Sequence, residues 1–235
     1  MYAGLLKDVV DFHDDVVRNI KGIRASQKLF DDLSDESDDQ AVAVAAESAD
    51  PVRSEAPLIT RPFDYGAVVT YPFVKFNGQG TRFSDGLDYG VWYGALALET
   101  TVHETIHHWH EFITDSFSRE DREIVGERRV FHARCDAILI DLRGKERRKR
   151  RLLDRRDYRY TQQLGRYLKE QHQNGLLVHS ARCHGTNADI FTPDVLSRTQ
   201  HMCFLTYRMN PTRDLVRIER TPRRKWLEIR PSSLR

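Results

Sequence analysis

Cysteine, long apolar runs and an N-terminal targeting pattern are all scarce or missing in this chain of 235 residues. Three cysteines are an odd and sparse set, so we expect reduced thiols and no disulfide framework. No apolar run approaches the roughly 20 residues that cross a bilayer. The chain begins MYAGLLKDVVDFHDD, with acidic residues where a signal peptide has a basic and then an apolar segment. These absences predict a cytoplasmic protein that makes no contact with a membrane.

The charged residues are nearly balanced in number but unevenly distributed. The net charge is +2, yet acidic residues dominate positions 30–55 and basic residues dominate RGKERRKRRLLDRR at 143–156. A basic surface can bind nucleic acid, but no zinc-finger, helix-turn-helix or RNP-type motif accompanies this one. We therefore expect a solvated face that lies near an anionic ligand or docks an acidic partner, and not a nucleic-acid-binding protein.

The pattern of apolar residues divides the chain into four segments. Residues 1–30 carry apolar side chains at spacings of three and four, which predicts an N-terminal amphipathic helix. Residues 31–57 are rich in Asp, Ser, Ala and Glu and are predicted to form an acidic linker. Residues 58–209 are expected to form the main domain. Residues 210–235 contain two short strand patterns around TPRR and are expected to form a C-terminal β-hairpin extension.

The main domain mixes strand and helix patterns. Residues 67–74, AVVTYPFV, are β-branched and aromatic and predict a strand, and a glycine-rich loop follows at 77–90. The second half of 91–112 has helical spacing, as does the basic segment 152–171. Further strands are predicted in CDAILIDLR, GLLVHSAR and HMCFLTYRM. Because helices and strands do not alternate regularly, we expect an α+β fold.

The stretch HETIH at residues 103–107 matches the H-E-x-x-H pattern of zinc hydrolases. In those enzymes two histidines one helical turn apart bind zinc and the glutamate is the base, while a third ligand lies further along the chain. Here the extended H-E-x-x-H-x-x-G-x-x-H pattern has His110 and Ile113 where glycine and the last histidine belong. A zinc metallohydrolase that uses His103, Glu104 and His107 stays open as an alternative, with stoichiometric zinc as its distinguishing sign.

Four other residues suggest a different chemistry around the same glutamate. Arg82 lies in the glycine-rich loop, Tyr93 and Glu104 follow at intervals of eleven residues, and Ser180 ends the apolar run GLLVHS. Arginine binds phosphate oxygens through two donors, and tyrosine offers a flat face to a heteroaromatic ring. A carboxylate can bind ribose hydroxyls and stabilise an oxocarbenium-like cation as a glycosidic bond breaks. The set therefore suits a ligand with phosphates and a ribose.

The order and spacing of these residues resemble the RES-domain family of bacterial toxins. The resemblance runs from about residue 58 to 196. It includes TRPF at 60–63, the loop GQGTRFSDG, VWYGALALETTVHE, and NGLLVHSARCHGTNADIFTP at 174–193. It departs from the family in the loop, where GTRFSDG replaces the usual G-G-R-W-N. The resemblance implies a bent, split sheet similar to that of the ADP-ribosyltransferases, with flanking helices.

The resemblance also implies an activity on NAD as substrate, with no metal. Family members cleave the nicotinamide–ribose bond and pass ADP-ribose to water, phosphate or a protein. A helix-turn-helix-type antitoxin neutralises the toxin by covering the site. The family's arginine, tyrosine, glutamate and serine fall on Arg82, Tyr93, Glu104 and Ser180.

The resemblance implies that an upstream arginine at Arg61 contacts the phosphates of NAD, and Arg182 is a further candidate for the same role. Glu99 rivals Glu104 as the catalytic glutamate, but the two lie at nearly opposite helical phases and only one can face the pocket. A non-catalytic interaction protein with the basic segment Arg147–Arg156 as its surface is a second alternative. The acceptor of ADP-ribose and the oligomeric state, including a homo-oligomer, are left open.

Overall fold

The computed structural model describes one mixed α+β unit, as the sequence predicts. It describes residues 2, 4–22, 65–74, 78, 80–117 and 121–234. Within them, the strands are β1 (Val9–Lys21), β2 (Trp92–Ala95), β3 (Ile124–Asp141), β4 (Gly175–His179), β5 (Thr186–Ile190), β6 (Leu196–Met209), β7 (Val216–Thr221) and β8 (Arg224–Ile229). The α-helices are α2 (Tyr65–Val74), α3 (Leu98–Phe117) and α4 (Arg159–Glu170). Four 3₁₀ helices are η1 (Lys145–Arg147), η2 (Arg150–Leu153), η3 (Pro193–Val195) and η4 (Pro231–Leu234).

The strands form a single bent sheet that splits along β3. In the described part of the chain the order is β1-β2-β5-β4-β3-β6-β7-β8, with a further pairing of β1 to β3. One edge of β3 pairs with β6 over most of its length and then with β4 at Ile140 and Asp141. The other edge pairs with β1, which also touches β2 where Val17 meets Ala95. The sheet is therefore bent and split, as the sequence predicts.

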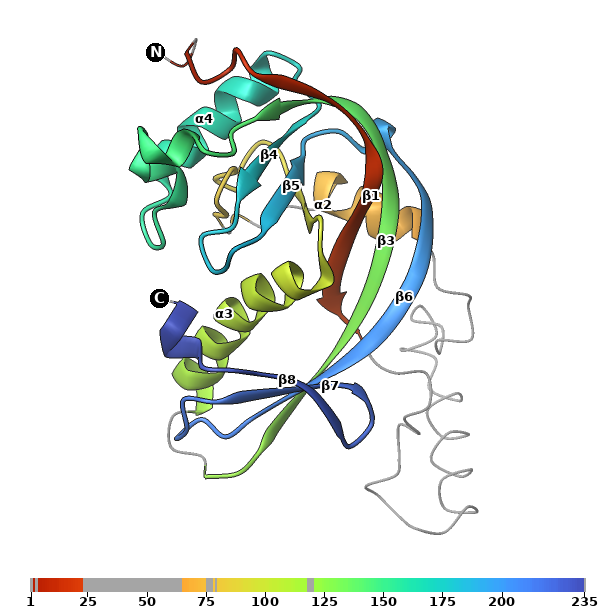
Figure 1. The fold of residues 1–235 in the computed structure, drawn as a ribbon, viewed down its shortest axis with the longest axis vertical. Helices are drawn as coiled ribbons and strands as arrows, with labels where there is room; N and C mark the ends of the chain where they lie inside the picture. The colour runs from red at the N-terminus through yellow and green to blue at the C-terminus, as the bar shows by residue number, and fades with distance from the viewer. Residues whose placement is uncertain are drawn as a thin grey trace, which may run out of the picture.

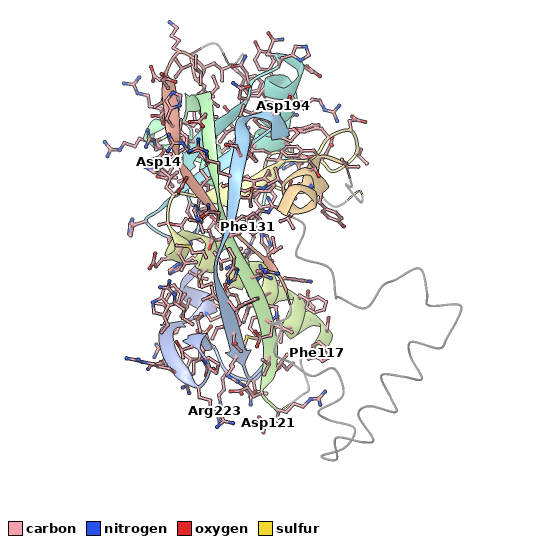
Figure 2. All side chains as sticks on the ribbon, turned by 90° about the vertical axis from the view of Figure 1, so that its right-hand side faces the viewer. Asp14, Phe117, Asp121, Phe131, Asp194 and Arg223 are labelled. Carbon is pink, nitrogen blue, oxygen red and sulfur yellow. The ribbon has the colours of Figure 1, made fainter. Side chains whose placement is uncertain are left out.

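The long strands β1, β3 and β6 curve side by side around helix α3, which lies on their concave side (Figure 1). Figure 2 views the same strands from their outer side, between the end of the molecule marked by Asp194 and the end marked by Asp121 and Arg223. Helix α3 buries Val102 and Ile106 in a core shared with β3, β6 and the C-terminal strands. The cavity described below lies between this helix and the strands β1, β2 and β5.

The predicted N-terminal helix is wrong, because residues 9–21 form strand β1. This strand pairs antiparallel with β3 along its whole length, from Val9 opposite Ile140 to Lys21 opposite Arg128. Apolar residues at spacings of three and four also occur in a twisted strand that is covered on both faces, and valine favours the strand. The N-terminal segment is thus part of the main sheet and not an appendage.

The predicted strand at 67–74 is also wrong, because these residues lie in helix α2. Val69 is buried, Val68 and Phe73 pack against the core, and Tyr71 and Val74 are exposed. This separation of buried and exposed residues fits the helical period, whereas alternation would fit a strand. The β-branched composition predicted the wrong element because packing outweighs intrinsic strand preference.

The other predicted elements are confirmed with shifted boundaries. The strands of CDAILIDLR, GLLVHSAR and HMCFLTYRM correspond to β3, β4 and β6, and the C-terminal hairpin is β7–β8. That hairpin continues the main sheet through the pairing of β6 with β7. The basic segment 152–171 becomes α-helical only at Arg159, after the 3₁₀ helix η2, and the predicted acidic linker at 31–57 lies outside the described residues. None of the described helices combines the length and apolar character needed to cross a membrane.

Candidate active site

A cavity of about 640 Å³ lies between helix α3 and the strands β1, β2 and β5. Five segments supply its polar wall: β1 with Arg18, the glycine-rich loop with Arg82, β2 with Tyr93, α3 with Glu104, and β5 with Asp189. Three of the four residues that the sequence places in one constellation thus line one cavity. The fourth, Ser180, lies directly behind the glutamate, as described next.

Glu104 is fixed by two neighbouring side chains. The Ser180 hydroxyl donates a hydrogen bond of 2.7 Å to Glu104 Oε1, and Asn187 Nδ2 donates one of 2.9 Å to the same oxygen. Among the described residues, no hydrogen bond reaches Oε2. Glu99, the rival glutamate, is exposed and does not line the cavity. The carboxylate of Glu104 therefore presents one fixed oxygen and one available oxygen at the cavity wall.

Ser180 is itself oriented by backbone groups in the loop that follows β4. Its hydroxyl oxygen accepts hydrogen bonds from the backbone N–H of Arg182 (2.9 Å) and of Cys183 (3.2 Å). The loop packs against the first turn of α3 at Gly185, where a Cβ atom would lie 2.1 Å from Thr100 Oγ1. Any larger residue would push the loop away from the helix. The close contact therefore sets the distance between Ser180 and Glu104.

The Tyr93 hydroxyl supports the glycine-rich loop. It accepts a hydrogen bond from Phe83 N (3.0 Å) and is hydrogen-bonded to Thr81 Oγ1 (2.7 Å). Burial raises the pKa of Tyr93, so the phenol stays neutral. Tyr93 lines the cavity, and its hydroxyl faces the loop. Tyr93 thus couples the strand to the loop that carries Arg82.

Tyr93→Phe is expected to lower the free energy of unfolding by about 1–2 kcal/mol, because the Phe83 N–H loses its acceptor inside the protein. Urea denaturation measures this difference. Tyr71→Phe is the matched control, because Tyr71 is exposed on α2 and should change stability little. Equal stabilities of the Tyr93 and Tyr71 variants would contradict this role of the hydroxyl.

Arg82 is held with part of its guanidinium facing the cavity. Nη1 donates to the carbonyl oxygens of Leu152 (3.2 Å) and Asp154 (2.9 Å), and the group lies 4.7 Å from the centre of the Tyr158 ring. Within the described part of the chain the hydrogen bonds of this guanidinium involve Nη1 alone, so Nε and Nη2 are available to donate to an anion. Helix α4 approaches the loop closely at Gly165, where a Cβ would lie 2.0 Å from the Phe83 carbonyl oxygen.

Arg18 and Asp189 are among the cavity residues that the sequence analysis missed. Arg18 of β1 donates from Nη1 to the Tyr93 carbonyl (3.2 Å) and lies 5.1 Å from the centre of the Trp92 ring. Burial lowers the pKa of Arg18 to about 10, so it is still a cation at neutral pH. Asp189 of β5 is 1% exposed. It lies in strand β5, residues 186–190, which the sequence analysis did not predict.

One of the two predicted phosphate contacts, Arg182, does not line this cavity. The Arg182 guanidinium is buried and donates to the carbonyl oxygens of Leu234 (3.2 Å) and Arg155 (2.8 Å). It links the C-terminus to the segment before α4 and does not line the cavity. This placement does not support a role for Arg182 in phosphate binding. Arg61 lies outside the described residues.

The residues of the predicted zinc site are not brought together. His103 Nδ1 is hydrogen-bonded to the Glu99 carbonyl oxygen at 2.7 Å, and Glu104 is engaged by Ser180 and Asn187. Among the described residues, the group whose ligand atoms could meet at a metal ion is His107, His108 and Glu111. It shares only His107 with the predicted set. The glutamate of HETIH therefore lies at the cavity without the two histidines of the motif as neighbouring ligands.

Comparison with known proteins places the chain in a family. No curated protein matches the chain. Among solved structures, it is similar to a chain in the crystal structure of the M. tuberculosis MbcT–MbcA toxin–antitoxin complex, at 11% identity and a TM-score of 0.46, covering 86% of this chain and 87% of that one. The family model described as the RES domain matches residues 57–210, which leaves β1 outside it. This match spans more than half of the sequence, and the chain belongs to the RES domain family.

Proposed function

We propose that this protein is an NAD-cleaving toxin of a toxin–antitoxin pair. The observation that carries the proposal is the fixed Glu104 carboxylate, held by Ser180 and Asn187 at the wall of a cavity that also presents Arg82 and Tyr93. A carboxylate with one oxygen fixed and one available suits a ribose whose glycosidic bond is breaking. Membership of the RES family supports this choice over other ligands with a ribose.

The bond that breaks joins the ribose C1′ to the ring nitrogen of nicotinamide. The bonding electrons go to that nitrogen, so the cationic pyridinium leaves as neutral nicotinamide, and positive charge develops on the ribose. Glu104 stabilises this charge electrostatically and binds a ribose hydroxyl through its available oxygen. The acceptor then forms a bond to C1′ and loses a proton where it carries one. This acceptor is water, phosphate or a protein side chain. Because the leaving group departs neutral, the scheme requires no metal ion.

The other cavity residues bind and orient the dinucleotide. Arg82 and Arg18 supply positive charge for the two phosphates. The Tyr93 ring lines the cavity and orients the nicotinamide ring. Ser180 acts on the substrate through Glu104, because its hydroxyl donates to that carboxylate. Arg61 belongs to this proposal as a phosphate contact from the family resemblance alone.

The proposed partner is a cognate antitoxin of the helix-turn-helix type that covers the entrance of the cavity. The 3₁₀ helix η2, which carries Arg150 and Arg151, lies next to this region, because the carbonyl oxygen of its Leu152 accepts a hydrogen bond from Arg82. An acidic partner surface would complement them. The antitoxin thereby excludes NAD from the site.

Expression in bacteria tests the toxin activity. Induction of the wild-type protein is expected to stop growth and to lower the cellular NAD pool by about tenfold or more, since a single active toxin turns over many substrate molecules. Glu104→Gln is the matched control, because it retains the shape of the side chain and lacks its charge. Growth arrest by both proteins with an unchanged NAD pool would contradict the proposal.

A further inference from the structure

Asp189 is a buried carboxyl group on the cavity wall, and neither of its oxygens has a partner in the part of the chain that the structure describes. It is 1% exposed, and neither Oδ1 nor Oδ2 has a hydrogen-bond partner among the described residues. Polar groups inside proteins are nearly always hydrogen-bonded. Asp189 lines the cavity, and the cavity is where a ligand could supply the missing partner.

The strand register directs Asp189 toward the part of the cavity beside Tyr93. Side chains alternate along β5, so Asn187 and Asp189 face the cavity, while Ala188 and Ile190 lie in the core on the other side. Tyr93 is the backbone neighbour of Asp189 on β2. Asn187 holds the glutamate. The ligand group that meets Asp189 thus lies near the ring of Tyr93 and on the same wall as Glu104.

Three charged or titratable groups influence Asp189: Glu104 from α3, Arg82 from the glycine-rich loop and the Tyr93 phenol from β2. Burial raises the pKa of Asp189 well above its usual range, and the negative charge of Glu104 raises it further, while Arg82 lowers it. Because both oxygens are also buried without a hydrogen-bond partner among the described residues, the site favours the neutral carboxylic acid over the carboxylate. In that form it presents one O–H donor and one carbonyl acceptor side by side.

A primary carboxamide is the complementary group, because it places a carbonyl acceptor next to an N–H donor. The two groups can form a cyclic pair of hydrogen bonds. A carboxylate in the same place offers acceptors only and adds a negative charge close to Glu104. We propose that Asp189 binds the carboxamide of nicotinamide and makes the site select NAD over its carboxylate analogue, nicotinic acid adenine dinucleotide. This inference rests on the proposed function.

The test compares the two dinucleotides as substrates of three proteins. For the wild type, kcat/KM for NAD is expected to exceed that for nicotinic acid adenine dinucleotide by about 100-fold, the upper end of the loss when a buried hydrogen-bonding group is left without its partner. In Asp189→Leu this ratio should fall below about fivefold, because leucine can neither donate nor accept. Asp189→Asn should keep the ratio within roughly threefold of the wild type, since an amide also offers a donor and an acceptor.

Folding is checked by thermal melting. Leucine replaces an unpaired buried polar group, so Asp189→Leu is expected to melt at or above the temperature of the wild type. An unchanged substrate ratio in Asp189→Leu would overturn the inference, and so would a lost ratio in a folded Asp189→Asn.

Calorimetric titration with free nicotinamide separates this inference from the proposed function. Binding that is lost in Asp189→Leu and retained in Asp189→Asn supports the amide contact, even if the wild type leaves NAD intact and the proposed function fails. Equal affinity of the wild type and Asp189→Leu for nicotinamide would exclude the proposed contact between Asp189 and the amide, even if the wild type cleaves NAD.

Discussion

Glu104→Gln is expected to lower the rate of NAD cleavage by about 1000-fold, the loss typical of removing one preorganised electrostatic contact to a transition state. Glutamine retains an oxygen for the hydrogen bonds from Ser180 and Asn187. The fold and the cavity should therefore persist, while the negative charge that stabilises the developing cation is lost. Steady-state kinetics should show the loss mainly in kcat, because the charge matters most when the bond is breaking.

Glu99→Gln is the matched control for this prediction. It makes the same chemical change five residues earlier on the same helix, at an exposed position outside the cavity. Its kcat and KM should stay within about twofold of the wild type, as expected for a surface substitution. If Glu99→Gln were the inactive variant and Glu104→Gln the active one, the assignment of the two glutamates would be reversed.

Arg82→Met is expected to lower kcat/KM for NAD by roughly 100-fold. This loss corresponds to about 3 kcal/mol, the upper end for a hydrogen bond to a charged group. Methionine retains the length and packing of the side chain but provides neither charge nor donors. Most of the loss should appear in KM, because the phosphates are bound in both the ground state and the transition state. The difference in kcat/KM between the wild type and Arg82→Met should also become smaller at higher salt, because salt screens the attraction between Arg82 and the phosphates in the wild type.

Arg159→Met provides the control for the loss of a nearby arginine. Arg159 begins α4 next to Tyr158, but its side chain is exposed and pairs only with Asp157 among the described residues. Its kcat/KM should match that of the wild type. Because Arg82 also binds the carbonyls of Leu152 and Asp154, the melting temperature of both variants is measured first. An Arg82→Met protein that is folded and has an unchanged KM would exclude Arg82 from NAD binding.

The structure brings together in one cavity the predicted site residues that lie nearest to one another in sequence. Arg82, Tyr93 and Glu104 are carried by a loop, a short strand and the helix that follows, so a single local unit positions them. Ser180 lies far away in sequence, but its segment joins the same unit through β5, which pairs with β2. The order of these residues along the chain was enough to suggest a shared site. Their exact roles in binding NAD are still predictions.

The elements that the sequence mispredicted depend on distant partners. β1 is a strand because it pairs with β3, more than a hundred residues later. Nothing in the local pattern of VVDFHDDVV distinguishes that strand from an amphipathic helix. Arg18 was missed for this reason, since a residue on a detached helix has no expected place in a cavity. Conversely, α2 is a helix despite its β-branched composition, because Val69 faces the core and Tyr71 faces solvent.

Asp189 was missed because its position at the cavity depends on the alternation of side chains along β5. In TNADI the residue reads as one polar position in a stretch of small residues. Once β5 is known to pair with β2 and β4, the same position must be buried on the face that borders the cavity. The local sequence carries no signal of this burial, because an acidic residue between Ala188 and Ile190 fits the ordinary alternation of a half-exposed strand.

The most direct test of the central claim is a count of products from purified protein. The wild-type protein is incubated with NAD in the presence of a metal chelator, with and without phosphate, beside Glu104→Gln. The account predicts one nicotinamide released for each NAD lost by the wild type, no effect of the chelator, and almost no release by the variant. The remaining product, ADP-ribose or its phosphorylated form, identifies water or phosphate as the acceptor. Intact NAD in the wild-type reaction, or cleavage that the chelator abolishes, would contradict the account.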